Sequence, residues 1–250
     1  VASITPVIVD PETTFLILDV RFKYDSSKTT LATSQIESEV VSAITKYNTD
    51  NLEKFEGVFR HSKVTRLIDD ANTSILNNTT NVNLGKFFAP DTTAATSYNI
   101  YFNNALYNPH SGHNSSAGGI LASTGFFING DTTNEHFLDD NGAGIVRLYY
   151  VLAGNRVYVD TTAGTINYST GAVFIESLFV TTVSDVDGAT STEIRITVVP
   201  NSKDIVPVRN QTLKLDLTNS TVLGEVDTVS VGDTSAAGTY TTSTSYSTPS

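Results

Sequence analysis

The chain has 250 residues and a formal net charge of −11, from 26 acidic and 15 basic residues. A polyanion repels other polyanions, so this composition disfavours non-specific binding to nucleic acid or to an anionic membrane. The absence of cysteine excludes disulfides, thiolate metal sites and cysteine nucleophiles. The sequence starts at Val1 and contains no methionine, and we therefore expect it to be a piece of a longer polypeptide.

The first predicted element is a β-strand in the segment TFLILDVRFKYD, residues 14–25. Every second position is apolar along its whole length, whereas the positions between are apolar only at Phe15 and Ile17. This alternation predicts a strand that is covered on one face throughout and on the other face only at its start.

A helix is predicted next, in SQIESEVVSAITKY, residues 34–47. Ser34 followed by Glu37 fits a capping box, in which each side chain accepts from a free backbone N–H at the helix start. Apolar residues then recur at helical spacing, namely Ile36, Val40, Ala43, Ile44 and Tyr47.

A second helix is predicted in SKVTRLIDDANTSI, residues 62–75, and it carries two adjacent carboxylates, Asp69 and Asp70. At about 100° per residue, its apolar residues share one face and the two aspartates lie on opposite flanks, about 140° and 120° from Val64. The two carboxylates diverge by about 100°, so they cannot chelate one ion or share one proton. We expect both to face solvent or a partner.

The remaining pattern predicts an α+β fold. A strand-like run at residues 81–88 completes a strand–helix–helix–strand unit, and beyond it the helical period gives way to β-type runs bounded by Gly, Asn, Asp and Pro. The predicted domains are an α+β domain over 1–90, a linker over 91–97, a β-rich, sandwich-like domain over 98–232 and a flexible Ser/Thr-rich tail over 233–250. We place two helices against a small sheet in the first domain.

Two dipeptides between β-type runs, Gly154-Asn155 and Asp187-Gly188, predict hairpin turns. The second lies in DVDGATSTE, residues 185–193, which is also similar to a calcium-binding loop. Because the segment lacks a third oxygen ligand and the full spacing, we favour the turn.

Three histidines are the candidate zinc ligands, and one of them, His136, lies beside Glu135 and ahead of Asp139 and Asp140. His110 and His113 occupy a Gly/Ser-rich loop that contains no rigid element to fix ligand geometry, so a solvated loop is the favoured interpretation. The full candidate set is His110, His113, Glu135, His136, Asp139 and Asp140.

Other catalytic or cofactor patterns are absent from the sequence. It has no G-x-G-x-x-G, no phosphate-binding loop and no G-x-S-x-G. Aromatic residues on the β-type runs are candidates for a sugar-binding platform, although core or interface positions explain them more simply. These residues are Tyr149, Tyr150, Tyr158, Phe174 and Phe179. We therefore assign no catalytic, cofactor-binding or metal-binding residue and do not predict an enzyme.

Several longer runs together resemble a known family: LDVRFKYDSSKTTL, FRHSKVTRLIDDANTSI, FLDDNGAGIVRLYY, GTINYSTGAVFIESL and VVPNSKDIVPVRNQTLKLDL. Over about residues 14–230 the chain resembles the C-terminal part of the large baseplate wedge subunit of contractile-tailed, myovirus-type bacteriophages, in the baseplate J-like superfamily. The resemblance implies a structural protein of the virion tail baseplate, assembled in the host cytoplasm. Its implied partners are a second copy of the chain, as a homodimer within a ring of wedges around the hub, and other baseplate wedge proteins.

Two other classes of function stay open at this point. A cell-surface carbohydrate-binding or adhesin β-module would explain the Ser/Thr/Asn-rich strands and loops. A tail-associated glycosidase would need two carboxylates facing each other across a cleft, roughly 5–10 Å apart. Asp69 and Asp70 do not supply that pair, and carboxylates distant in the sequence are the remaining source.

Overall fold

The structure is a computed structural model that describes residues 12–108, 119–186, 188–208 and 210–228. Its helical elements are a 3₁₀ turn η1 (Ser26–Lys28), α1 (Thr33–Tyr47), a π-helical turn η2 (Asn48–Leu52) and α2 (His61–Asp69). Its strands are β1 (Glu12–Tyr24), β2 (Ile75–Phe88), β3 (Thr96–Tyr101), β4 (Ala122–Ser123), β5 (Phe126–Ile128), β6 (Asp131–Asp140), β7 (Ile145–Leu152), β8 (Asn155–Asn167), β9 (Ala172–Leu178), β10 (Val180–Val183), β11 (Ile194–Val198), β12 (Gln211–Leu215) and β13 (Thr221–Val226).

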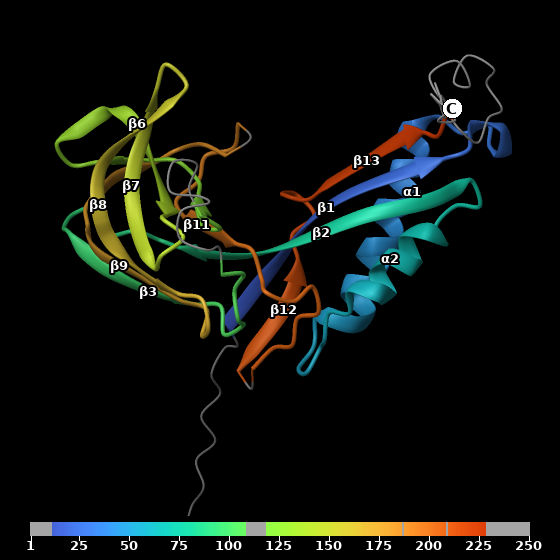
Figure 1. Cartoon of the computed structure of the whole chain (residues 1–250), viewed down its shortest axis with the longest axis horizontal. Coiled ribbons are helices and arrows are strands. Elements are labelled where there is room, and N and C mark those ends of the chain that lie inside the picture. Colours follow the sequence, from blue (N-terminus) through green and yellow to red (C-terminus); the bar gives the residue numbers. More distant parts are fainter. Residues whose placement is uncertain (1–11, 109–118, 187, 209, 229–250) are drawn as a thin grey trace, which may run out of the picture.

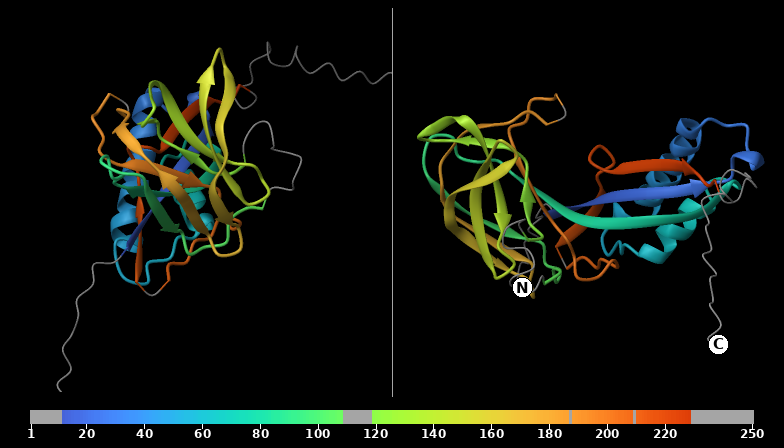
Figure 2. Two further views of the ribbon diagram at one scale, coloured as in Figure 1. Left: turned by 90° about the vertical axis from the view of Figure 1, so that its left-hand side faces the viewer. Right: turned by 45° about the horizontal axis from the view of Figure 1, so that its top comes forward.

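The molecule has two lobes joined by long strands (Figures 1 and 2). In the first lobe α1 and α2 lie against one face of β1, β2 and β13, and in the second lobe strands β3 and β6–β9 form a strongly curved sheet. The α+β class is thereby confirmed in outline. Among the described residues no helix is long and apolar enough to cross a membrane.

Strand β1 has the burial pattern predicted from its sequence. Its alternate apolar side chains, from Leu16 to Tyr24, are buried beneath the helices. On the other face the ring of Phe15 packs edge-on against Phe87 with centroids 5.0 Å apart, whereas Arg21 and Lys23 are exposed. The prediction of a strand covered on its second face only at its start is confirmed.

Helix α1 buries the predicted apolar stripe, but its cap differs from the predicted one. The N-cap is Ala32, and the side chain of Gln35 accepts a hydrogen bond from the Ala32 N–H at 2.9 Å. The predicted capping box of Ser34 and Glu37 is therefore wrong by two residues. Glu37 accepts instead from the backbone N–H of Gly224 in β13, a partner that no local pattern reveals.

Helix α2 is shorter than its apolar pattern predicted. It ends at Asp69, and Ile75, which the apolar pattern assigns to the helix, begins strand β2. Between them the Asn72 side chain accepts from the backbone N–H and the hydroxyl of Ser74 at 2.9 and 2.7 Å. This Asx turn gives the backbone an alternative to helical hydrogen bonds, so the chain reverses there.

Strand β2 belongs to both lobes. Along its length it pairs antiparallel with β1, from Tyr24↔Ile75 to Phe15↔Gly85. Its last residues pair on the opposite side with β11, from Val198↔Leu84 to Ile194↔Phe88. The continuous sheet order is β12-β1-β2-β11-β4-β6-β7-β8-β9-β3, so the β-rich lobe is attached to the first lobe through main-chain hydrogen bonds.

The end of the described chain returns to the first lobe. Strands β12 and β13 both pair parallel with β1, β12 along Glu12–Leu16 and β13 along Asp19–Tyr24. The predicted limits 1–90, 91–97 and 98–232 stay a prediction. We propose that β12 and β13 be counted with the first domain, because β1 is their pairing partner. The predicted tail over 233–250 lies outside the described residues.

The hairpin turns fall close to their predicted places. Leu152 pairs directly with Asn155, so the two turn residues are Ala153 and Gly154, one position earlier than predicted, with φ of 50° and 80°. At the second turn Val186 and Ala189 exchange both backbone hydrogen bonds, and Gly188 has a φ of 78°. Positive φ at these positions is the conformation that a tight hairpin requires.

Candidate functional site

Asp69 and Asp70 point away from the core and from each other. Both are exposed, as predicted. Asp69 accepts a hydrogen bond from the Asn78 side chain at 2.7 Å, and Asp70 pairs with Arg66 on the preceding turn at 3.4 Å. Each carboxylate therefore has its own partner, Asn78 on β2 for Asp69 and Arg66 on α2 for Asp70, and the two carboxylates share no partner.

The predicted zinc candidates do not come together in the described part of the chain. His136 is fully buried on β6, and its Nε2 lies 3.7 Å from the Asp131 carboxylate. His110 and His113 lie outside the described residues. Among the described residues no three His, Asp or Glu side chains are placed to hold a metal ion.

Three acidic residues among the described ones are buried, Asp25 after β1 and the adjacent Asp139 and Asp140 at the end of β6. Asp139 accepts two hydrogen bonds from the guanidinium of Arg147, from Nε at 2.9 Å and from Nη2 at 3.0 Å. Two further groups donate to the same carboxylate: the guanidinium of Arg156 at 2.6 Å and the hydroxyl of Tyr158 at 2.9 Å. The carboxylate thus has both charge partners and hydrogen-bond donors, which is how a buried charge is tolerated.

Two of the predicted aromatic platform residues belong to this cluster. Arg147 lies over the ring of Tyr158 at 4.2 Å, and Arg156 lies over the ring of Tyr149 at 4.6 Å. Burial raises the pKa of the Tyr149 hydroxyl, and burial together with the hydrogen bond to Asp139 raises that of Tyr158. These two rings are therefore engaged with arginines inside the β-rich lobe.

Asp140 organises the neighbouring loops. Its carboxylate accepts from the backbone N–H of Ile120 at 2.6 Å and of Leu121 at 2.7 Å, and from that of Gly142 at 3.0 Å. It also accepts from the Tyr168 hydroxyl at 2.6 Å. Burial, and then this hydrogen bond, raises the pKa of the Tyr168 hydroxyl well above its usual value.

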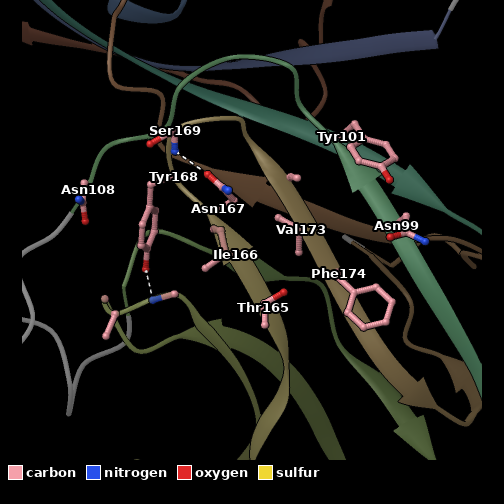
Figure 3. A pocket seen from close by; sticks show the side chains of 14 residues that line it. Asn99, Tyr101, Asn108, Thr165, Ile166, Asn167, Tyr168, Ser169, Val173 and Phe174 are labelled. Atoms are coloured by element: carbon pink, nitrogen blue, oxygen red, sulfur yellow. Dashed lines mark hydrogen bonds between the residues drawn. The ribbon is translucent and has the colours of Figure 1, made fainter.

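Tyr168 forms one wall of an open cavity of about 930 Å³ in the β-rich lobe (Figure 3). Its hydroxyl accepts a hydrogen bond from the Gly144 N–H at 3.2 Å and so ties the cavity to the loop that Asp140 holds. Charged side chains are absent from its described lining, which consists of Asn99, Tyr101, Asn108, Gly142, Ala143, Gly144, Thr165, Ile166, Asn167, Tyr168, Ser169, Ala172, Val173 and Phe174. The lining offers amides, hydroxyls and aromatic rings, and it contains one of the five predicted platform residues, Phe174.

A second candidate surface is the side of the first lobe that the helices leave uncovered. The exposed residues Arg21 and Lys23 of β1 lie there between β2 and β13, opposite Thr79 and Asn77 on one side. On the other side they lie opposite Leu223 and Glu225 of β13. This face, which we call the open sheet face, combines both signs of charge, amides and one exposed leucine.

Strand β13 also forms an edge of the sheet. Among the described strands it pairs with β1 alone. The Gly224 N–H is occupied by Glu37 of α1 at 2.9 Å, and a Cβ at Gly224 would lie 2.6 Å from the Phe22 ring. The helix therefore seals part of an edge that would otherwise offer free main-chain groups to another strand.

The comparison with protein families gives a match in this first lobe. Residues 12–86 match the family described as baseplate structural protein gp6, C-terminal domain III. The matched range begins at β1, includes α1 and α2, and ends within β2. No curated protein matches the chain. The resemblance to a phage baseplate wedge subunit is thus confirmed in the strand–helix–helix–strand unit, whose residues 12–86 are similar to C-terminal domain III of the baseplate structural protein gp6.

Proposed function

We propose that the chain is a structural component of a phage tail baseplate wedge and that it forms subunit contacts in the ring around the tail hub. The observation that carries this proposal is the family match over residues 12–86. That unit covers one face of its sheet with helices and leaves the other face open. We place its partners, other baseplate wedge proteins and a second copy of the chain, on the open sheet face and along β13.

The chemistry of the open sheet face supports a contact between proteins. Arg21 has a side chain that is 61% exposed and a carboxylate neighbour, Asp19, at 3.7 Å. Exposed pairs of this kind contribute little to the stability of the folded chain, so both charges are available to a partner. Charges at an interface set its register and its rate of association.

The test is co-purification of the full chain with the proteins encoded by neighbouring baseplate genes. Arg21→Glu is expected to weaken co-purification, because it replaces the positive charge with a third negative charge near Asp19 and Glu225 on this face. Arg66→Glu is the matched control, since Arg66 is also an exposed arginine beside an aspartate but lies on α2. Equal effects of the two substitutions, or no co-purification of the unchanged chain, would contradict the proposed contact.

A second candidate function is carbohydrate binding by the β-rich lobe. It is favoured by the cavity beside Tyr168, whose described lining is uncharged and rich in amides and hydroxyls, with Tyr101 47% exposed at its wall. Sugars are bound by such combinations of polar groups and aromatic faces. Binding to a glycan array that is lost in Tyr101→Ala would support this function, and an array without signal would remove it.

A further inference from the structure

One arginine in the described chain has a buried donor with no partner. The Nη1 atom of Arg195 is inaccessible to solvent and makes no hydrogen bond to any described residue. No ion pair within the described ranges involves its guanidinium, although the chain carries an excess of carboxylates. A buried charged donor without a partner costs stability, so its retention needs a reason.

The backbone holds Arg195 in a fixed position. It lies on β11 opposite Phe87 of β2. Its N–H donates to the Thr124 hydroxyl at 3.0 Å, and the Thr124 N–H donates to its carbonyl at 3.0 Å. The guanidinium therefore projects from a rigid strand, and this is the placement expected of a binding group whose geometry matters.

Arg195 lines a cavity of about 350 Å³ at the junction of the two lobes. The wall on one side is the ring of Phe87, and the other walls come from the hairpin before β11 and from the connection between β12 and β13. The lining residues besides Arg195 are Phe87, Thr124, Val186, Ala189, Thr190, Ser191, Glu193, Thr218 and Asn219. The recess thus combines an apolar wall, hydroxyl groups, one cation and one carboxylate, that of Glu193.

The charges around this recess select the kind of anion that fits. A guanidinium offers parallel N–H donors that match a carboxylate. Glu193, two residues earlier on the chain, is exposed and also lines the cavity. Its negative charge opposes a dianion such as phosphate more strongly than it opposes a single carboxylate.

We infer that the Arg195 recess binds the carboxylate of an aspartate or glutamate side chain presented by a neighbouring protein subunit. The methylene stem of that side chain packs against Phe87, and its two oxygens accept from the N–H groups of the guanidinium that face the recess. The inference rests on the proposed function in one respect, because the subunit that presents the carboxylate is a baseplate neighbour.

The experiment uses the full chain and a small probe in place of the neighbour. The probe is aspartate blocked at both ends, N-acetyl-aspartate N′-methylamide, which carries one carboxylate, and the matched probe is the blocked asparagine. Binding is followed by NMR through the Nε–Hε signal of Arg195 and the backbone amide signal of Thr124. We expect saturable shifts with the aspartate probe and affinity at least about ten-fold weaker with the asparagine probe or with inorganic phosphate.

Variants assign the effect to one side chain. Arg195→Gln is expected to abolish the Thr124 shift while keeping the unfolding midpoint, because no described group loses a partner. Arg21→Gln, an exposed arginine on another strand, is expected to bind the probe unchanged. Equal shifts with both blocked amino acids, tighter binding of phosphate, or shifts that persist in Arg195→Gln would each overturn the inference. None of these results bears on whether the chain is part of the baseplate, because that question is tested separately by locating the chain in isolated phage tails.

Discussion

Asp139 and Arg147 form a bidentate ion pair inside the β-rich lobe, with Nε–Oδ1 and Nη2–Oδ2 distances of 2.9 and 3.0 Å. Both residues are buried. Removing Arg147 takes away two charge-assisted hydrogen bonds in the interior and leaves Arg156 as the remaining charge partner of Asp139, which is more costly than the loss of an exposed pair.

Arg147→Met is therefore expected to lower the free energy of unfolding by about 1.5–3 kcal/mol. Arg66→Met is the control, because Arg66 pairs with Asp70 on the surface of α2 at 3.4 Å, and its loss is expected to cost less than about 0.5 kcal/mol. Urea unfolding followed by circular dichroism measures both. Similar losses in the two variants would show that Asp139 is accessible to water.

The two adjacent aspartate pairs are expected to behave oppositely. Asp69→Asn combined with Asp70→Asn should change the free energy of unfolding by less than about 1 kcal/mol, because both carboxylates are exposed. Asp140→Ala should cost several-fold more, since it leaves the N–H groups of Ile120 and Leu121 without their acceptor. Thermal unfolding of the two variants distinguishes them, and a larger loss in the Asp69/Asp70 variant would contradict their placement.

Much of the first lobe follows from sequence pattern, and most of the candidate site does not. The period of two in β1 and the apolar stripe of α1 are local signals that fix which side chains face the core. The Asp139–Asp140 pair resembles the Asp69–Asp70 pair in sequence. Its partner Arg147 comes from the next strand in the chain and Tyr168 lies 28 residues away, so no local pattern distinguishes the buried pair from the exposed one.

Contacts between residues far apart in the sequence also lie at the N-terminal ends of both helices. Glu37 bonds to Gly224, 187 residues away, and the first N–H of α2, at His61, is bound by Asp204, 143 residues away. The parallel return of β13 to β1 brings Gly224 to Glu37, and the bridge between Phe59 and Ile205 brings Asp204 to the start of α2. A sequence of short β-type runs gives no sign of which earlier strand a late strand will join.

The Asp204 contact predicts a pH dependence. The hydrogen bond and charge of Arg60, followed by the His61 N–H, hold the pKa of the Asp204 carboxyl below its usual value of 3.8. A carboxyl whose pKa is lower in the folded state contributes stability above its unfolded pKa and loses it as the pH falls through the folded pKa. Asp204→Asn lacks this contribution.

The unchanged chain should therefore be more stable than Asp204→Asn at neutral pH, and the difference should shrink below a pH of about 4. The stability difference is measured by the midpoints of urea unfolding of both proteins between neutral and acidic pH. A difference that stays constant down to a pH of about 2.5 would show that the carboxylate charge is not involved.

Self-association is expected at micromolar concentration. The open sheet face and the edge strand β13 provide contact surface. At physiological salt the Debye length is about 8 Å, so of the charges that make up the net −11 only those near the contact oppose pairing. Light scattering coupled to size exclusion should give twice the chain mass of 26.8 kDa, and Arg21→Glu should shift the protein toward monomer. A monomer up to several hundred micromolar would contradict the homodimer.

The most direct measurement is the location of the chain in isolated tails of the phage whose genome encodes it. The account predicts that mass spectrometry detects the chain in purified tails and that cryo-electron microscopy places the fold of residues 12–86 in the baseplate ring. Tails that contain every other baseplate protein but lack this chain would contradict the structural role.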